Sequence, residues 1–120
     1  MTINDYPPGS GIGSHIDTHS AFDDGISSLS LGSSCVMVFK NCRETASPNE
    51  CKAVFLPRRS LAVMTKEARY TWSHGIPFRD YDEDENGVRF ERQRRVSLTY
   101  RKARGFKCEC TYQDLCETHL

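Results

Sequence analysis

The stretch Arg95-Val96-Ser97-Leu98-Thr99-Tyr100-Arg101 alternates strictly between polar and apolar side chains. Alternation with a period of two is typical of a β-strand, whose successive side chains leave opposite faces. The polar face of this strand carries Arg95, Ser97, Thr99 and Arg101. Two arginines on one inward-facing surface need anionic partners to offset the loss of their hydration. A bound dicarboxylate would satisfy both, because a guanidinium grips a carboxylate in a fork; acidic side chains of the chain itself are the alternative.

Short runs rich in β-branched and aromatic residues recur along the chain, separated by Gly, Pro, Asn and Asp clusters. Strands are predicted over three further ranges, Ile26–Leu31, Cys35–Phe39 and Leu61–Thr65. No stretch sustains a period of 3.6 residues, so we expect at most one helical turn, near Lys66–Tyr70. Residues 40–52 and 79–88 are predicted to form surface loops, the second with a tight turn at Asn86-Gly87. The pattern indicates a mainly β chain folded as a sandwich or jelly roll.

The chain has 120 residues, of which 38% are hydrophobic and 27% charged, which fits one globular domain. No apolar run approaches the roughly 20 residues that span a bilayer, and no secretory leader is evident. We therefore expect an intracellular protein with no membrane partner, in the cytoplasm, with the nucleus as a second location.

The charges are unevenly distributed, although their formal sum is zero. Residues 89–107 carry eight Lys and Arg against one Glu. A stripe of this kind could attract phosphates, and so a nucleic-acid partner. A solvated basic strand edge is the alternative.

Two histidines and one aspartate have the spacing of a metal site. His15 and Asp17 lie two residues apart, so on an extended backbone their side chains leave the same face, and His74 follows 59 residues later. Two imidazoles and one carboxylate make up the facial triad that holds non-haem Fe(II) with positions left open. By itself His-x-Asp can be a hydrogen-bonded turn pair. Together with the arginine-bearing strand, the set indicates an oxygenase that uses a dicarboxylate co-substrate.

Three of the six cysteines lie within the last thirteen residues, at Cys108, Cys110 and Cys116. Without a secretory leader, metal binding is favoured over disulfide formation, and we expect Cys42 and Cys51 to be reduced thiols. Closely spaced thiolates suit Zn²⁺, which takes four Cys or His ligands in structural sites. His19 and His119 are the candidates for the fourth ligand; ordinary reduced thiols are the alternative.

The site residues belong to a longer pattern, Asn4-x-Tyr6-x-x-Gly9-x-x-Ile12-x-x-His15-x-Asp17, followed by His74 and Arg95-x-Ser97-x-Thr99-x-Arg101. This pattern resembles that of the AlkB family of Fe(II)/2-oxoglutarate dioxygenases, and the resemblance runs from about Asn4 to Cys116. Further stretches are similar to one branch of the family, the tRNA wobble-uridine hydroxylases: Ile16–Phe22, Ser28–Gly32 and Leu56–Met64.

The resemblance implies a double-stranded β-helix, or jelly roll, with iron at the mouth of the barrel. The Fe(II) ligands would be His15, Asp17 and His74. The ligands of 2-oxoglutarate would be Asn4, Tyr6, Arg95 and Arg101, with the two arginines paired to its carboxylates. The branch also has a structural Zn²⁺ site built from one His and three Cys. In this chain the zinc ligands would be His19, rather than His119, with Cys108, Cys110 and Cys116.

The resemblance also bears on domain organisation and activity. We expect a single, partial oxygenase core over residues 1–120, with a zinc-binding tail at about 104–120 and without the family's N-terminal strands and nucleotide lid. The implied reaction hydroxylates 5-methoxycarbonylmethyluridine at the tRNA wobble position while 2-oxoglutarate and O2 give succinate and CO2. Partners would be tRNA or another nucleic acid, and a methyltransferase-activating partner is a further candidate.

Two alternatives to this activity remain open. One is oxidative demethylation of alkylated bases in DNA or RNA, which other members of the family perform. The other is not enzymatic: a catalytically incomplete metal-binding remnant, or an RNA-binding module. Turnover of 2-oxoglutarate separates the enzymatic hypotheses from the last one.

Overall fold

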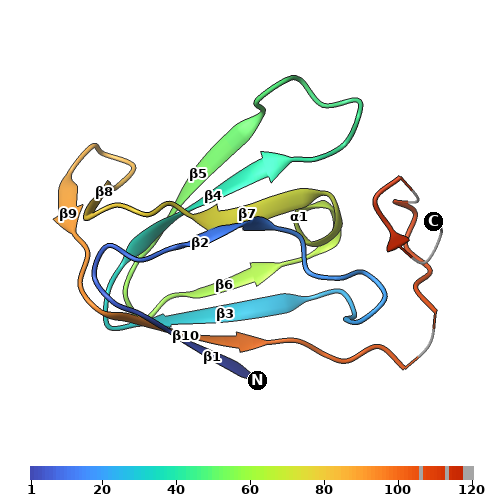
Figure 1. The fold of residues 1–120 in the computed structure, drawn as a ribbon, viewed down its shortest axis with the longest axis horizontal. Helices are drawn as coiled ribbons and strands as arrows, with labels where there is room; N and C mark the ends of the chain where they lie inside the picture. The colour runs from blue at the N-terminus through green and yellow to red at the C-terminus, as the bar shows by residue number, and fades with distance from the viewer. Residues whose placement is uncertain (106, 113, 118–120) are drawn as a thin grey trace.

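Strands dominate the computed structural model, which describes residues 1–105, 107–112 and 114–117 (Figure 1). Within this part of the chain the elements are β1 Thr2–Tyr6, β2 Ile12–His15, β3 Ile26–Leu31, β4 Cys35–Asn41, β5 Cys51–Leu56, β6 Leu61–Met64, α1 Lys66–Tyr70, β7 Trp72–Ile76, β8 Tyr81–Glu83, β9 Arg89–Glu91 and β10 Arg95–Tyr100. The prediction of a mainly β chain is confirmed. Among the described residues, no helix has the length and apolar character needed to cross a membrane.

Eight of these strands form two antiparallel sheets that face each other as layers (Figure 1). One sheet has the strand order β1-β10-β3-β6 and the other has the order β2-β7-β4-β5, while β8 and β9 form a separate hairpin. Successive strands repeatedly change sheet, as from β1 to β2, β2 to β3 and β3 to β4. This alternation between two sheets is that of a jelly roll, so the predicted architecture is confirmed.

The local predictions hold where the hydrophobic pattern is regular. β3 and α1 have the predicted bounds, whereas β4 continues to Asn41 and β6 ends at Met64. The predicted loop over residues 40–52 is shorter than expected, because its two ends belong to β4 and β5. The predicted loop over residues 79–88 is wrong at Tyr81–Glu83, which is strand β8 and pairs with β9. The turn between them lies where expected, and the positive φ of Gly87 there favours glycine.

The inward faces of β3 and β10 are polar. Ser28, Ser30, Ser97 and Thr99 are all buried, while the leucines of β3 are only half-buried on the opposite face. The apolar core lies elsewhere between the sheets and consists of Cys35, Met37, Leu56 and Ile76, with Phe39 and Ala62 packed against it. The space between the two sheets therefore contains both a small apolar core and a polar pocket.

A buried carboxylate attaches the β8–β9 hairpin to the sheets. Asp82 is only 2% exposed and accepts hydrogen bonds from Arg92 Nε at 2.7 Å, Arg79 Nε at 2.8 Å and the main-chain N–H of Val36 at 3.2 Å. Burial opposes ionisation of Asp82, but the two arginines outweigh it and hold the pKa of this carboxyl below its usual range. Arg92 also donates to the carbonyls of Ser10 and Pro77. This network explains why a polar segment forms a strand.

Replacing Asp82 with Ala should lower the free energy of unfolding by about 3–5 kcal/mol, because the Arg92 guanidinium would remain buried without its anion. Urea unfolding of the purified chain measures this loss. The matched control is Asp5→Ala, which breaks an exposed ion pair with Arg94 and should leave the midpoint unchanged within error. Equal effects of the two substitutions would show that the Asp82 network does not stabilise the fold.

Candidate functional site

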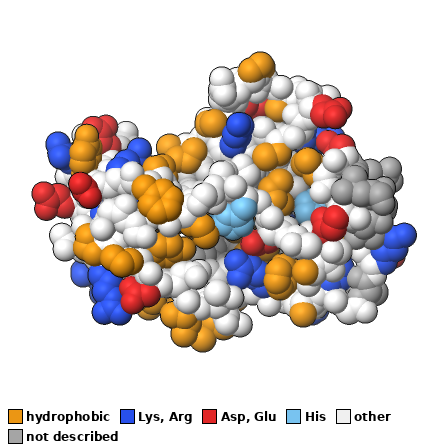
Figure 2. All heavy atoms as spheres, in the orientation of Figure 1, with side chains coloured by type: hydrophobic (Ala, Val, Ile, Leu, Met, Phe, Trp, Pro, Cys, Tyr) orange, Lys and Arg blue, Asp and Glu red, His pale blue; other side chains and the backbone are white. Residues whose placement is uncertain are grey.

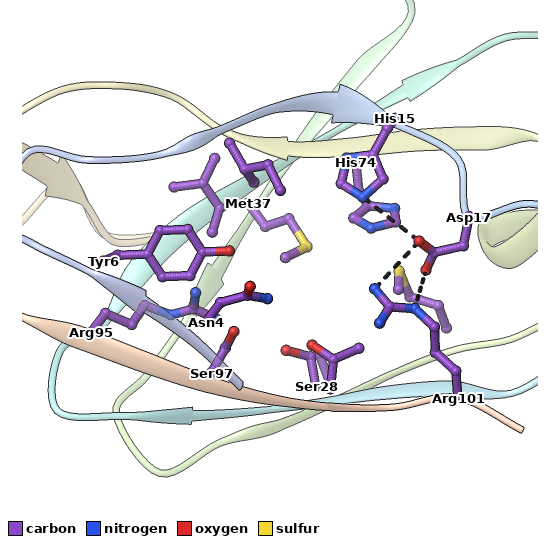
Figure 3. Close-up of a pocket in the computed structure, with 15 residues that line it drawn as sticks. Asn4, Tyr6, His15, Asp17, Ser28, Met37, His74, Arg95, Ser97 and Arg101 are labelled. Carbon is purple, nitrogen blue, oxygen red and sulfur yellow. Dashed lines mark hydrogen bonds and ion pairs between the residues drawn. The ribbon is translucent and has the colours of Figure 1, made fainter. Parts of the chain in front are cut away.

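A pocket opens between the two sheets and collects most of the polar residues that the sequence singles out (Figure 3). Its lining consists of Asn4, Tyr6, Ile12, His15, Asp17, Ser28, Met37, Ala62, Met64, His74, Ile76, Arg95, Ser97, Thr99 and Arg101. The histidines come from one sheet, and Asn4, Tyr6 and Arg95 come from the other. Ser28 and Met37 were not predicted as pocket residues, although the alternation of β3 was visible in the sequence.

The two predicted iron-binding histidines lie on neighbouring strands. His15 ends β2 and is the register partner of His74 on β7, and the centroids of their rings are 4.5 Å apart. Gly75 allows this approach, since a Cβ at that position would lie 2.9 Å from Cα of Ser14. Asp17 follows just beyond the end of β2, in a loop rather than on the strand as predicted.

The three side chains nevertheless converge. Nε2 of His15 lies 3.7 Å from Oδ1 of Asp17. His15, Asp17 and His74 each place one ligand atom within 4.8 Å of the other two, close enough to hold one metal ion. Asp17 and His74 are both 8% exposed, so the carboxylate and one imidazole are largely removed from water. The predicted set of three is therefore brought together in one place.

The protonation of the histidines suits metal binding. Nδ1 of His15 lies 2.9 Å from the carbonyl oxygen of Gly13, which can only accept, so the proton resides on Nδ1 and Nε2 keeps its lone pair. Burial lowers the pKa of His74 to about 4, so this imidazole is neutral at ordinary pH. Neutral imidazoles beside a carboxylate are the donor set that Fe(II) takes in oxygenase triads.

Arg101 is paired with Asp17 in this structure. Its Nε donates to Oδ2 of Asp17 at 3.2 Å and its Nη2 donates to Oδ1 at 3.4 Å, as the dashed lines in Figure 3 show. A divalent ion would compete for the same carboxylate oxygens. The alternative that acidic side chains pair with the arginines is thus correct for Arg101.

Arg95 has no such partner. It is only 4% exposed, its Nη2 donates to Oγ of Ser30 at 2.9 Å, and its guanidinium lies 5.4 Å from the ring centroid of Tyr6. Its Nε makes no hydrogen bond, and among the described residues no carboxylate lies within ion-pair distance of it. A buried guanidinium with a free donor fits a ligand carboxylate in the pocket. Strand register places Tyr6 opposite Arg95 and Asn4 opposite Ser97, beside that donor.

Three of the four residues predicted for the second metal site lie together. His19, Cys110 and Cys116 each place one ligand atom within 4.8 Å of the others. Cys108, the fourth predicted ligand, is buried and nearby in the sequence but does not belong to this cluster of three. Burial raises the pKa of Cys110 to about 12, so a bound cation would be needed to hold its thiolate at neutral pH. The other candidate, His119, lies outside the described residues. Cys42 and Cys51 form no disulfide, as expected for reduced thiols.

His19 is held in the orientation that a ligand needs. Its Nε2 lies 2.8 Å from the carbonyl oxygen of Tyr70, so Nε2 carries the proton, and Nδ1 faces Cys110 Sγ at 3.5 Å. Burial lowers the pKa of His19, which favours the neutral imidazole. A His whose second nitrogen donates to a carbonyl is the usual arrangement around bound zinc. The donor set and its orientation fit Zn²⁺.

Part of the basic stripe over residues 89–107 is paired within the chain. Four of its arginines pair with acids of the chain: Arg92 with Asp82, Arg94 with Asp5, Arg101 with Asp17 and Arg104 with Asp23. Lys102 also lies 3.9 Å from Asp23. The pairs made by Arg92, Arg101 and Arg104 are largely buried and help to hold the fold, whereas Arg94 and Lys102 are exposed. Fewer cations therefore remain for phosphates than the sequence predicts.

Two facing antiparallel sheets enclosing a His, Asp and His cluster and an unpaired arginine define an oxygenase of the Fe(II)/2-oxoglutarate class. The sequence model of the 2OG-Fe(II) oxygenase superfamily matches residues 1–101. The chain belongs to this superfamily.

Curated relatives add a more particular likeness. The protein named tRNA (carboxymethyluridine(34)-5-O)-methyltransferase ALKBH8 from Macaca fascicularis is 47% identical over 98% of this chain and 19% of its own length. Its Mus musculus counterpart is 45% identical with the same coverage. The alkylated DNA repair protein ALKBH8 homolog of Arabidopsis thaliana is 40% identical over 98% of this chain and 38% of its own. The chain thus spans about a fifth to two fifths of the length of these relatives.

The metal-free chain should lose stability as the pH falls from about 6.5 to 4. In that window the unfolded chain binds a proton at residue 74, whose ordinary pKa is about 6.5, while folded His74 stays neutral. This difference contributes about 3 kcal/mol above pH 6.5, lost progressively on acidification. Urea unfolding at several pH values, with His74→Gln as the comparison, measures it. Parallel stability curves for the two proteins would contradict the depressed pKa.

Proposed function

We propose that this chain is the catalytic core of an Fe(II)/2-oxoglutarate dioxygenase that hydroxylates 5-methoxycarbonylmethyluridine at the wobble position of tRNA. Membership of the superfamily makes the chain an oxygenase. The observation that carries the site assignment is one pocket holding His15, Asp17 and His74 beside the unpaired, buried guanidinium of Arg95.

In this proposal each pocket residue has one task. His15, Asp17 and His74 bind Fe(II). Arg95 grips one carboxylate of 2-oxoglutarate, aided by the neighbouring Asn4 and Tyr6. Arg101, which pairs with Asp17 in this structure, would bind the other carboxylate. When bound, iron and 2-oxoglutarate supply the oxidising chemistry, in which O2 and 2-oxoglutarate give succinate, CO2 and one hydroxylated carbon of the substrate. Zn²⁺, held by His19, Cys108, Cys110 and Cys116, anchors the tail.

The choice of substrate rests on the names of the relatives. Those names describe methyl transfer to carboxymethyluridine at position 34 of tRNA. Methylation of a carboxymethyl oxygen gives the methoxycarbonylmethyl ester, which has a methylene between base and ester that an oxygenase could hydroxylate. The methyltransferase reaction would therefore prepare the substrate of this oxygenase, so a methyltransferase is also its expected partner. We place both activities in the cytoplasm, with the nucleus as a second location.

Oxidative demethylation is the second candidate. It is favoured by one specific observation, the printed name of the plant relative, which refers to alkylated DNA repair. Both reactions use the same metal and co-substrate, so the pocket does not separate them. The two reactions can be separated by identifying which nucleic acid stimulates turnover of 2-oxoglutarate.

Replacing Arg95 with Leu should raise the 2-oxoglutarate concentration needed for half-maximal turnover at least tenfold, since a charge-assisted bidentate contact would be lost. Metal affinity should stay within twofold of wild type, because Arg95 does not contact His15, Asp17 or His74. Succinate release against 2-oxoglutarate concentration measures the first quantity. The matched control is the adjacent, exposed Arg94→Leu, which should behave as wild type; unchanged 2-oxoglutarate use by Arg95→Leu would remove Arg95 from the site.

The purified chain with Fe(II), O2 and 2-oxoglutarate should release succinate, and tRNA bearing 5-methoxycarbonylmethyluridine should stimulate that release. His74→Ala should abolish it, since the triad would lose one of its two imidazoles. Stimulation by methylated DNA or RNA, with release of formaldehyde, would favour demethylation. A folded, iron-loaded chain without turnover would instead support a catalytically incomplete remnant or an RNA-binding module.

A further inference from the structure

One loop carries residues of both candidate metal sites. Asp17 belongs to the His15/Asp17/His74 cluster, and His19 belongs to the Cys/His cluster. Thr18 alone separates them in the sequence, so the two sites share a short backbone segment. Residues 17–23 will be called the shared loop.

Arg69 of helix α1 holds the shared loop through its main chain. Its side chain donates to four carbonyl oxygens of the loop: Nη1 to Asp17 at 2.7 Å, Nη2 to Thr18 at 3.1 Å and to Phe22 at 2.9 Å, and Nε to Asp23 at 3.3 Å. Arg69 is only 2% exposed, and no carboxylate among the described residues lies within ion-pair distance of it. A buried guanidinium that bonds only to backbone fixes the shape of that backbone. Lysine could not replace this planar fork of donors.

Arg104 holds the same loop from the other side. Its Nε donates to the carbonyl oxygen of His19 at 3.0 Å, its Nη2 to that of Phe22 at 2.9 Å and to the Tyr70 hydroxyl at 3.1 Å. Its Nη1 lies 3.1 Å from Oδ1 of Asp23. Arg104 lies four residues before Cys108, at the start of the segment that carries the cysteines.

Main-chain contacts join that segment to the shared loop as well. The N–H of Asp23 donates to the carbonyl of Lys102, the N–H of Arg104 donates to that of Ala21, and the N–H of Ser20 donates to the Glu117 carboxylate. The Tyr70 ring also meets the His19 ring edge-on and stacks on the ring of Tyr112. Any ion that draws the cysteines and His19 together therefore acts on the loop that positions Asp17.

We propose that Arg69 and Arg104 couple the two metal sites, so that an ion bound by His19 and the cysteines raises the affinity of the His15/Asp17/His74 site. The proposal rests on the assignment of the two metal sites under the proposed function, but not on the reaction or the substrate. Arg69 is a positioning residue: it touches no ligand atom and acts through the carbonyl of Asp17. Changes around metal ligands of this kind typically alter affinity by about 10–100-fold. Coupling of binding is reciprocal, so filling the Asp17 site must tighten the other one equally.

Equilibrium binding of Mn(II), an oxygen-stable probe of the His15/Asp17/His74 site, tests the proposal. Free Mn(II) is measured by electron paramagnetic resonance, for the zinc-free chain and for the chain with one equivalent of Zn²⁺. We expect Mn(II) to bind about tenfold more tightly to the zinc-loaded chain. Competition with a colorimetric zinc chelator should show the same factor when Mn(II) is added.

Arg69→Lys should remove the coupling, so that Mn(II) affinity no longer depends on zinc, while zinc itself still binds. The matched control is Arg94→Lys, at an exposed arginine that pairs only with Asp5, which should keep the tenfold factor. Circular dichroism checks that each variant is folded. A folded Arg69→Lys protein that retains the full factor would overturn the assigned role of Arg69.

Comparing the Mn(II) affinity of the wild-type chain with and without zinc needs no substitution. It therefore tests the coupling even if Arg69→Lys does not fold. Equal Mn(II) affinity with and without zinc would overturn the coupling while leaving the proposed activity intact. No Mn(II) binding in either state would instead contradict the proposed iron site itself. Coupled binding in a chain without 2-oxoglutarate turnover would support the coupling and count against the proposed function.

Discussion

Burial of arginine is the physical constraint on which this structure depends. A guanidinium taken out of water must be compensated by an anion or by several hydrogen bonds. Arg69, Arg92 and Arg95 are each less than 10% exposed, and the chain compensates them in three different ways. Arg92 receives a buried carboxylate, Arg69 receives four main-chain carbonyls, and Arg95 receives one hydroxyl. The first two arrangements are complete and hold the fold together. The compensation of Arg95 is incomplete, because its Nε donor has no acceptor, and Arg95 lies in the pocket.

The same constraint explains why this jelly roll has a small core. Ser28 of β3 and the alternate polar residues of β10 line the pocket, and only part of the space between the sheets is left for the apolar side chains of Met37, Leu56 and Ile76. Small domains bury a modest fraction of their apolar surface in any case. Internal ion pairs and arginine–carbonyl contacts consequently take over part of the structural role that a larger apolar core has in other sandwiches. The cationic segment 89–107 illustrates this, because most of its charges are satisfied within the chain.

Sequence predicts those features that depend on local pattern and spacing. Strand alternation correctly located β3 and β10, and the spacing of His15, Asp17 and His74 identified a cluster that the fold brings together. Strand β8 was missed because its formation depends on Asp82 meeting Arg92 and Arg79, a tertiary contact with no local signal. The role of Arg69 could not be predicted from the sequence for the same reason. Its acceptors are main-chain carbonyls, which every residue possesses.

The charge balance of the pocket indicates how its ligands would bind. Asp17, Arg95 and Arg101 together contribute one net positive charge to the pocket, and burial keeps His74 neutral. Fe(II) alone would add two positive charges to a site poor in water, and 2-oxoglutarate alone would add two negative ones. Bound together they leave the net charge of the pocket unchanged, so the binding of each should raise the affinity for the other. The Asp17–Arg101 ion pair would link the two, because an ion held by the Asp17 oxygens would leave Arg101 available to pair with the co-substrate. The metal should therefore bind more tightly in the presence of its co-substrate, and the co-substrate more tightly in the presence of the metal.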